Sequence, residues 1–451
     1  MRPRTGCLLF AMLFNVAVCS RVISQQSPVT AKMVKEEFLH AWNGYKKYAW
    51  GHDALKPLSK QPHDWYGSSL YMTPVDAYDV MLLMGLKKES EETKKLIMDS
   101  LSFNKNVEVQ AFEIIIRLLG GLLSAYQMDG DRRFLTLAED LGNRLLPIYN
   151  TPTGMPYRYV HLRTGQIRDS LNNPAEIGTA LLEFGTLSKL TNNPMYYEKA
   201  KRALVQLYNR RSKIGLVGTW INVETGEWTD KTSHIGGAID SYYEYLIKAW
   251  LLFGDKECKA MWEESIVAIN TYVADTSYGG LWYGQVDMES GKRTGTTFGS
   301  LEAFFPAVLC LGGDIGRARM LQESCFKMWN LYGIEPEEID YSTMSVTSKR
   351  YYLRPEIVES AYYLHHFTGD PMYVKMGETI FRGLVKYCRT DAGYAMLNDV
   401  TTKEQSDRME SFFFAETLKY LYLLFDRTES LTFENIVFTT EAHPIRRNPD
   451  E

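Results

Sequence analysis

The chain has 451 residues, of which 23% are charged and 13% are aromatic, and its formal net charge is −5 at pH 7. This negative balance provides no basic surface for phosphate backbones, so no nucleic-acid partner is expected. A single compact core rarely exceeds about 250–300 residues, and a chain of this length therefore needs an architecture that extends without deepening its core.

The first residues have the features of a secretory signal. Two arginines precede an apolar run from Cys7 to Val18, which ends in small residues before Ser20. We predict a signal peptide over residues 1–20, cleaved near residues 19–20, and a mature chain in the secretory pathway, a periplasm or the extracellular space. An alternative is a lipoprotein anchored through Cys19. No later stretch has the roughly 18 consecutive apolar residues of a membrane span, so none is expected.

The dipeptide Gly-Asp closes apolar helical stretches at nearly regular intervals. It begins at Gly130, Gly254, Gly313 and Gly369, and Asn193-Pro194 occupies the equivalent position between the first two. Glycine ends one helix in the left-handed conformation and aspartate caps the next, as in a short turn between antiparallel helices. The repeat of roughly 60 residues predicts an array of helical hairpins with long connections.

Apolar residues at i, i+3 and i+4 spacing predict helices that form seven pairs. A short turn joins the members of a pair, whereas longer connections with strand-like segments join the pairs, so we predict an all-α fold of two concentric rings. The helices are expected near residues 37–50, 69–86, 89–101, 108–127, 131–146, 174–192, 195–208, 236–253, 255–274, 297–311, 313–331, 354–368, 371–388 and 409–425. The strand-like segments are Met155–Val160, Gly218–Trp228, Gly280–Val286, Glu337–Tyr352 and Gly393–Val400.

The helix before each short turn also carries acidic residues in its first turn or its middle. The helix dipole ordinarily explains such a carboxylate, which it stabilises by roughly a few tenths of a kcal/mol. That explanation fits Glu113 and Glu416 poorly, because both stand among large apolar residues, where an ionised carboxylate must be paired or bound to a cation. The acids of these helices are Asp76, Asp79, Glu113, Glu176, Glu183, Asp240, Glu244, Glu302, Glu356, Glu359, Glu410 and Glu416.

Four cysteines, at positions 258, 310, 325 and 388, follow the predicted signal peptide. Cys310 and Cys325 lie on the two helices of one pair, so a disulfide between them is feasible in an oxidising compartment. Free thiols are the alternative. No two cysteines have the spacing of metal ligands.

Six stretches in order along the chain resemble glycoside hydrolase family 47, the class I α-1,2-mannosidases. They are Ala41–Asp53, Phe112–Tyr126, Asp240–Tyr245, Leu353–Ser360, Arg408–Phe413 and Phe438–Pro444. The resemblance implies an (α/α)7 barrel plugged by a C-terminal β-hairpin, in agreement with the seven pairs. It also implies one catalytic domain over residues 33–444, followed by a tail over 445–451, and we expect a monomer.

This family resemblance implies a calcium-dependent exo-α-1,2-mannosidase that trims terminal mannose from high-mannose N-glycans or glycoproteins with inversion. Inversion needs two carboxyls about 6.5–9.5 Å apart, one to protonate the leaving oxygen and one to activate a water. By the resemblance, Glu113 is the acid, acting through a water, and Glu356 is the base. Asp240 matches a third catalytic carboxylate, whose role as acid or helper stays open.

The resemblance also assigns the metal and sugar contacts. Thr440 matches the residue that binds Ca²⁺ with its hydroxyl and carbonyl oxygens, and this ion accepts six to eight oxygen ligands. Arg117 follows Glu113 by one helical turn, so both side chains are expected to face the cavity. His52 and His443 are interpreted as structural. The residues expected to contact the sugar or to order the ion's waters are Arg117, Glu176, Arg354, Glu359, Phe412, Glu416 and Glu441.

Two departures from the family pattern bear on specificity. Processing mannosidases usually pair a cysteine at the position of Ala303 with the counterpart of Cys325, and those of the ER carry an arginine at the position of Ala238. The stretch Gly236–Asp240 is more similar to the ER degradation-enhancing mannosidase-like branch. A non-catalytic mannose-binding factor that uses the same cavity is the alternative function. Retention of all three catalytic carboxyls favours the enzyme, because a lectin needs no matched acid and base.

Overall fold

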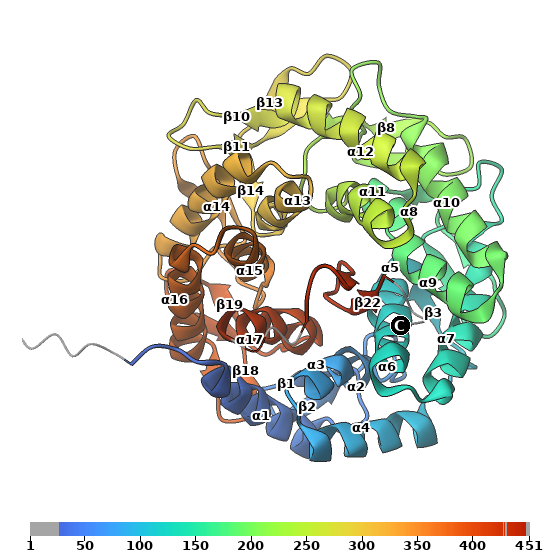
Figure 1. Ribbon diagram of the computed structural model, residues 1–451, viewed down its shortest axis with the longest axis vertical. Coiled ribbons are helices and arrows are strands. Elements are labelled where there is room, and N and C mark those ends of the chain that lie inside the picture. Colours follow the sequence, from blue (N-terminus) through green and yellow to red (C-terminus); the bar gives the residue numbers. More distant parts are fainter. Residues whose placement is uncertain (1–26, 427, 429–430, 448–451) are drawn as a thin grey trace, which may run out of the picture.

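The computed structural model describes residues 27–426, 428 and 431–447. The predicted signal peptide and the last residues of the predicted tail lie outside the described residues. Two concentric rings of helices surround a central axis, and the chain passes once around it (Figure 1). The described residues therefore form the all-α, (α/α)7 barrel that the sequence predicts.

The first six inner helices precede the short turns, and each packs against the outer helix that follows it, whereas the seventh is the last helix of the described residues. The inner helices are α2 (Met72–Asp76) with α3 (Tyr78–Leu83), α5 (Ala111–Ile114) with η1 (Ile115–Leu119) and α6 (Gly120–Asp129), α8 (Pro174–Gly178) with α9 (Leu181–Thr191), α11 (Asp240–Phe253), η4 (Leu301–Phe304) with α13 (Phe305–Leu311), α15 (Glu356–Thr368), and η5 (Phe413–Leu418) with α17 (Lys419–Phe425).

The outer ring begins and ends beside the same inner helix, because α1 packs against α17 and so closes the circle. The outer helices are α1 (Ala31–Tyr48), α4 (Lys87–Ser100), α7 (Arg132–Leu145) with η2 (Leu146–Tyr149), α10 (Pro194–Tyr208), α12 (Lys256–Ala268) with η3 (Ile269–Val273), α14 (Ile315–Asn330) and α16 (Pro371–Tyr387). Every predicted helix is present, although several inner helices are broken into consecutive segments.

The short turns have the predicted chemistry. Gly130, Gly254 and Gly369 end their helices in the left-handed region, with φ of 84°, 69° and 66°. The aspartate after each glycine caps the next helix by accepting a backbone N–H hydrogen bond. In the Gly313-Asp314 turn, Gly312 ends the helix with φ −77°, Gly313 follows in the left-handed region with φ 82°, and Asp314 caps the next helix. In the turn at Asn193, Asn192 takes the left-handed conformation (φ 56°) and Asn193 is the cap.

Short antiparallel strands fill the long connections, and each predicted strand-like segment overlaps at least one of them. The strands before the C-terminal hairpin are β1 (Ala54–Lys56), β2 (Gln61–His63), β3 (Glu108–Gln110), β4 (Tyr159–His161), β5 (Ile167–Arg168), β6 (Leu171–Asn172), β7 (Trp220–Asn222), β8 (Trp228–Asp230), β9 (Thr232–Ser233), β10 (Ala274–Asp275), β11 (Trp282–Tyr283), β12 (Gln285–Asp287), β13 (Arg293–Gly295), β14 (Thr297–Gly299), β15 (Glu338–Asp340), β16 (Ser345–Ser348), β17 (Arg389–Thr390), β18 (Gly393–Tyr394), β19 (Met396–Asp399) and β20 (Glu404–Ser406). Sheets β3–β4–β5 and β6–β7–β8 lie before the inner helices that carry the site.

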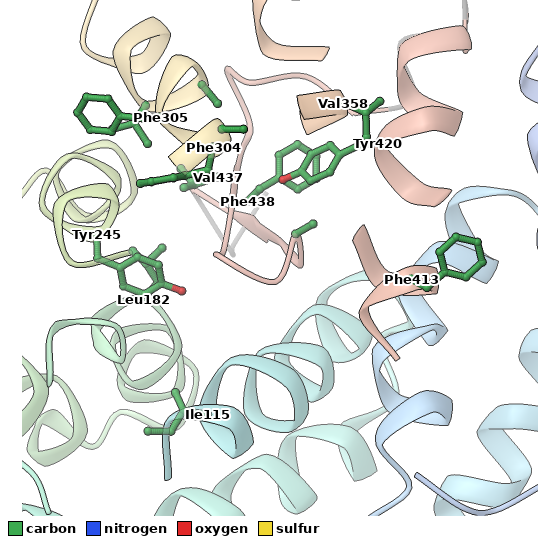
Figure 2. Close-up of a cluster of buried hydrophobic side chains, with 14 of the residues drawn as sticks. Ile115, Leu182, Tyr245, Phe304, Phe305, Val358, Phe413, Tyr420, Val437 and Phe438 are labelled. Carbon is green, nitrogen blue, oxygen red and sulfur yellow. The ribbon is translucent and has the colours of Figure 1, made fainter. Parts of the chain in front are cut away.

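The C-terminal hairpin, β21 (Ile436–Phe438) and β22 (Pro444–Arg446), enters the centre of the ring (Figure 1). Strand β21 contacts α11 and β22 contacts α6. Figure 2 shows Val437 and Phe438 among side chains of the inner helices, and the Phe438 ring lies 5.8 Å from that of Tyr420. The hairpin is the predicted plug, and β22 continues beyond the predicted domain limit at residue 444.

The segments α5, η1 and α6 form one helical stretch, Ala111–Asp129, that is long and apolar enough to cross a membrane by length and composition alone. The sequence predicts a helix here, over residues 108–127, and no membrane span. In the structure 78% of its most apolar window is buried inside the protein. Helices α2, α3, α7 and α9 and strand β22 all contact this stretch, which explains its apolar composition.

Cys310 and Cys325 are free, buried thiols, so of the two alternatives that the sequence left open the disulfide between them is not formed. Cys310 lies in the last turn of α13, next to the short turn, whereas Cys325 lies in the middle of α14. A rise of about 1.5 Å per residue places Cys325 roughly 15 Å along α14 from Ile315. A disulfide needs Cα atoms within about 7 Å, and antiparallel packing does not bring these two so close.

Gly44 of α1 packs closely against the backbone of Ala392, and substitution of this glycine tests the packing near the closure of the ring. A Cβ atom at Gly44 would lie 1.8 Å from the backbone oxygen of Ala392, whereas at Gly316 of α14 the nearest heavy atom would be 3.8 Å away. We expect Gly44→Ala to lower the free energy of unfolding by about 3 kcal/mol or more, because the backbone must move. The control Gly316→Ala should change it by less than about 1 kcal/mol. Equal melting temperatures of the two variants in circular dichroism would contradict this packing.

Candidate active site

A cavity of 370 Å³ lies inside the inner ring. Its walls come from the first turns of α5, α8, α11 and α15, where the long connections enter the ring, and carboxylates there gain from the helix dipoles. Every residue that the sequence analysis assigned to catalysis, sugar contact or metal binding lines it. These residues are Glu113, Arg117, Glu176, Asp240, Arg354, Glu356, Glu359, Phe412, Glu416, Thr440 and Glu441.

Arg117 connects several acids of the cavity. Its Nε atom lies 2.9 Å from Oε2 of Glu113, its Nη1 atom donates to the Glu441 carboxylate, and the same Nη1 is 3.8 Å from Oδ2 of Asp76. Burial alone would lower the pKa of Arg117, but the carboxylates of Glu441 and Glu113 raise it. Glu113 therefore faces a permanent cation, which is the pairing that an acid in its apolar sequence context requires.

Asp240 and Glu356 each begin an inner helix, and both hold protons more tightly than usual. Burial raises the pKa of Asp240 to about 7, against the opposing hydrogen bond from the Ser241 N–H at 2.7 Å. Burial likewise raises the pKa of Glu356 to about 7, although Nη1 of Arg354 lies 4.0 Å from its Oε1. Oε2 of Glu356 is buried and has no hydrogen-bond partner among the described residues, so it is free to accept a proton.

Glu176 is held by residues that the sequence analysis did not single out. Its carboxylate accepts hydrogen bonds from Gln110 at 2.8 Å, from Asn173 at 3.0 Å and from Arg158 at 3.0 Å. Arg158 also lies 5.3 Å from the Trp220 ring, and all four side chains line the cavity. Asn173 had a local signal, because it precedes Pro174 and caps α8. No local sequence pattern indicated Arg158 or Trp220 as residues of the cavity.

The bottom of the cavity is formed by Thr440 and Glu441 of the hairpin turn. The Thr440 N–H donates to the Tyr245 hydroxyl at 3.2 Å, and that hydroxyl donates to Glu183 at 2.6 Å. Burial is the main reason that the pKa of Glu441 rises to about 8, and repulsion from Asp76 adds to it.

Two further acids beside this floor behave in the same way. Burial and the nearby Glu244 raise the pKa of Glu359 to about 8, while the Tyr420 hydroxyl donates to its carboxylate at 3.2 Å. Burial, followed by repulsion from Glu441, raises the pKa of Glu416 well above its ordinary value. Burial, together with repulsion between neighbouring carboxylates, therefore favours a proton or a cation at the floor.

A closed helical ring with several buried carboxyls in one cavity is typical of a glycosidase, because an acid and a base must face the same bond. Residues 37–447 match Glycosyl hydrolase family 47. The chain therefore belongs to this family and is a glycoside hydrolase, which confirms the family resemblance seen in the sequence.

Named relatives support the same assignment. ER degradation-enhancing alpha-mannosidase-like protein 2 of Homo sapiens is 37% identical over 91% of this chain and 76% of that protein. Endoplasmic reticulum mannosyl-oligosaccharide 1,2-alpha-mannosidase of Rattus norvegicus is 38% identical over 95% of this chain and 70% of that protein. These near-equal identities do not separate the two branches. Among solved structures, the alpha-1,2-mannosidase from Trichoderma reesei superposes with a TM-score of 0.86 at 29% identity and covers 94% of this chain and 100% of that one.

The raised pKa values of Asp240 and Glu356, about 7 each, predict how stability depends on pH. Unfolded, these carboxyls ionise near 3.8 and 4.5, so between those values and about 7 the folded protein binds more protons. Stability should then fall as pH rises, by roughly 1.4 kcal/mol per pH unit for each such proton. We expect the melting temperature of chelator-treated protein to decrease from about pH 5 to about pH 7. Asp240→Asn should weaken the decrease, because an amide does not titrate, and a melting temperature that rises over this range would contradict the prediction.

Proposed function

We propose that the protein is an inverting, calcium-dependent exo-α-1,2-mannosidase that removes terminal mannose from high-mannose N-glycans. The observation that carries this proposal is the gathering of Glu113, Asp240 and Glu356 around one cavity in a chain of family 47. The named mannosidases among its relatives support the choice of mannose as the sugar.

Glu356 is the proposed base. A base must be ionised when the water attacks, and the guanidinium of Arg354, 4.0 Å away, favours the ionised form. A second contact holds Arg354 in place, because its guanidinium also donates to the Glu337 carboxylate. The unpartnered Oε2 of Glu356 then accepts the proton of the attacking water.

The acid must hold a proton at the working pH, and here the environments of Glu113 and Asp240 differ. Nε of Arg117 lies 2.9 Å from the Glu113 carboxylate, whereas burial raises the pKa of Asp240 to about 7. On these grounds Asp240 is the proposed proton donor, and Glu113 orients the water through which a proton passes. This refines the expectation from the sequence, which gave the acid role to Glu113 and left that of Asp240 open.

The other lining residues bind the sugar in this proposal. Phe412 offers an aromatic face, and the guanidinium of Arg117 lies 5.6 Å from the centre of its ring. A pyranose has an apolar face of C–H groups that suits such a surface, while its hydroxyls suit carboxylates. The carboxylates placed for this are Glu176, Glu359, Glu416 and Glu441.

Members of the family are metal-dependent in general, and the cavity floor fits a hard cation. Thr440 presents oxygen ligands, and the pKa values of Glu441 and Glu416 beside it are raised mainly by burial, with repulsion from neighbouring carboxylates adding to it. Among the residues that the structure describes, no three His, Cys, Asp or Glu side chains converge as a metal cage. Thr440 would therefore hold Ca²⁺ together with waters ordered by Glu359, Glu416 and Glu441. When bound, the ion would supply positive charge for the 2- and 3-hydroxyls of mannose.

A non-catalytic mannose-binding factor is not favoured. The relatives of this chain by sequence and structure include named mannosidases. A protein that only binds mannose would also have no use for a proton donor and a base in the same cavity. We further propose that the protein acts as a monomer on glycans or glycoproteins of the secretory pathway. The name of the rat relative, which places that protein in the endoplasmic reticulum, supports this compartment.

The first test is release of mannose from α-1,2-linked mannobiose. Glu356→Gln keeps the side-chain volume but removes the base, so we expect kcat to fall by about 10²–10⁴-fold while mannobiose still binds. Glu302→Gln is the matched control, since Glu302 also has a pKa raised to about 7 by burial but does not line the cavity. NMR of the first product should show the β-anomer. Binding without release by the wild-type protein in added calcium would instead indicate a lectin.

The metal assignment is tested at Thr440. Thr440→Val preserves the shape of the side chain but removes its hydroxyl, whereas Thr440→Ser retains the hydroxyl. We expect calcium affinity, measured by isothermal titration calorimetry, to fall by at least about tenfold in the valine variant and to stay close to wild type in the serine variant. Excess calcium should restore mannose release by Thr440→Val. Equal calcium affinities of the two variants would exclude the Thr440 hydroxyl as a ligand.

A further inference from the structure

Beneath the cavity floor lies a cluster of charged side chains with no role in the chemistry described above. Asp76 of α2, Asp79 of α3, Lys419 of α17 and His443 of the hairpin are each no more than 1% exposed. These residues come from both ends of the chain, so the folded ring alone brings them together. Buried charges of this kind persist only where each is paired.

His443 lies between two carboxylates. Its Nδ1 atom is 2.7 Å from Oδ2 of Asp79, and its Nε2 atom is 3.3 Å from Oδ1 of Asp76. A carboxylate at both ring nitrogens favours the doubly protonated imidazolium. Burial by itself would lower the pKa of His443, but Asp79 and Asp76 raise it to about 9.

Lys419 fixes the same carboxylate to the hairpin. Its Nζ atom lies 2.9 Å from Oδ1 of Asp79 and donates to the backbone oxygen of Ala442 at 2.6 Å. The hydroxyl of Ser124 donates to Oδ2 of Asp79 at 3.0 Å. Asp79 is thus held from three directions and serves as the fixed point of the cluster.

Two consecutive glycines of α6 make room for the imidazole. A Cβ atom at Gly120 would lie 3.1 Å from Cδ2 of His443, and one at Gly121 would lie 3.3 Å from Cε1 and 2.8 Å from Cγ1 of Val75. Side chains at these positions would displace the ring from its carboxylates. The Gly120-Gly121 pair is therefore explained by the close approach of the hairpin.

The cluster reaches the catalytic cavity through Asp76. Oδ2 of Asp76 accepts a hydrogen bond from the Ser411 hydroxyl and lies 3.8 Å from Nη1 of Arg117. Arg117 in turn holds Glu113 through Nε at 2.9 Å. An unbroken series of charged contacts therefore runs from His443 through Asp76 and Arg117 to Glu113.

We propose that Asp76 and His443 are positioning residues for the Glu113–Arg117 pair. His443 fixes Asp76, Asp76 orients the Arg117 guanidinium, and Arg117 sets the position of the Glu113 carboxylate in the cavity. The position of the Glu113 carboxylate therefore depends on the position of the C-terminal hairpin. The expected effect of Asp76 and His443 on kcat rests on the proposed function. Their expected effect on the position of Glu113 does not.

Asp76→Asn tests the proposal, because the amide keeps the shape of the side chain and removes its charge. We expect kcat for mannose release to fall by about 10²-fold, as a displacement of about 1 Å in a catalytic group can cause, with KM nearly unchanged. His443→Gln should act in the same way. In a Glu113→Gln background, Asp76→Asn should change kcat by less than about twofold, because both substitutions act through the same carboxylate.

The matched control is Tyr78→Phe. Tyr78 is the residue before Asp79 on α3, and its buried hydroxyl donates to Asp129 at 2.8 Å, outside the cluster. This variant should lose thermal stability and keep its kcat. If Asp76→Asn lowers kcat no more than Tyr78→Phe does, or lowers it equally in the Glu113→Gln background, the proposal is overturned.

A crystal structure of the Asp76→Asn variant tests the proposal without a measurement of mannose release. The separation between Nε of Arg117 and Oε2 of Glu113, 2.9 Å here, should lengthen beyond hydrogen-bond range. An unchanged separation overturns the positioning role even if mannose release is confirmed. Conversely, a wild-type protein that releases no mannose refutes the proposed function and leaves this structural test intact.

Discussion

The interior of the ring depends on the positive charge of Arg117. Its guanidinium meets Glu113 and Glu441 directly and Asp76 at 3.8 Å, so one cation serves acids from three segments of the chain. Carboxylates taken out of water repel each other and lose hydration, and such a group is stable only if it is paired or protonated. Both solutions occur here. Glu113 is paired, whereas Asp240, Glu359 and Glu416 have raised pKa values.

The helical ring explains why these acids are in one place. Helices α8, α11 and α15 begin beside the cavity, so the carboxylates in their first turns line it and gain from the helix dipoles. Glu176, Asp240 and Glu356 are placed in this way by three helices that share one local arrangement. The outer helices bury the faces of the inner helices that point away from the cavity. A long chain can therefore form a ring whose hydrophobic core does not deepen as helices are added.

The sequence predicted the helices and turns well because their signals are local. Gly130 and Asp131 specify a turn through backbone conformation and one hydrogen bond, whatever surrounds them. The site residues came from family resemblance, since no spacing rule brings Glu113 beside Thr440. Arg158 was missed because it lies in the long connection before α8, where no local pattern indicates its contact with Glu176. The free thiols at Cys310 and Cys325 follow from how far each lies along its helix, which pairing of helices alone does not specify.

Closure of the ring by α1 and α17, with the hairpin seated last, has a consequence for protein synthesis. Synthesis proceeds from the N-terminus, so α1 is translated long before α17, the helix that completes its burial. Contacts between distant segments form slowly, so the apolar faces of the early helices stay accessible to chaperones during elongation. Residues 436–446 supply the bottom of the cavity, and catalysis is therefore impossible until they have left the ribosome.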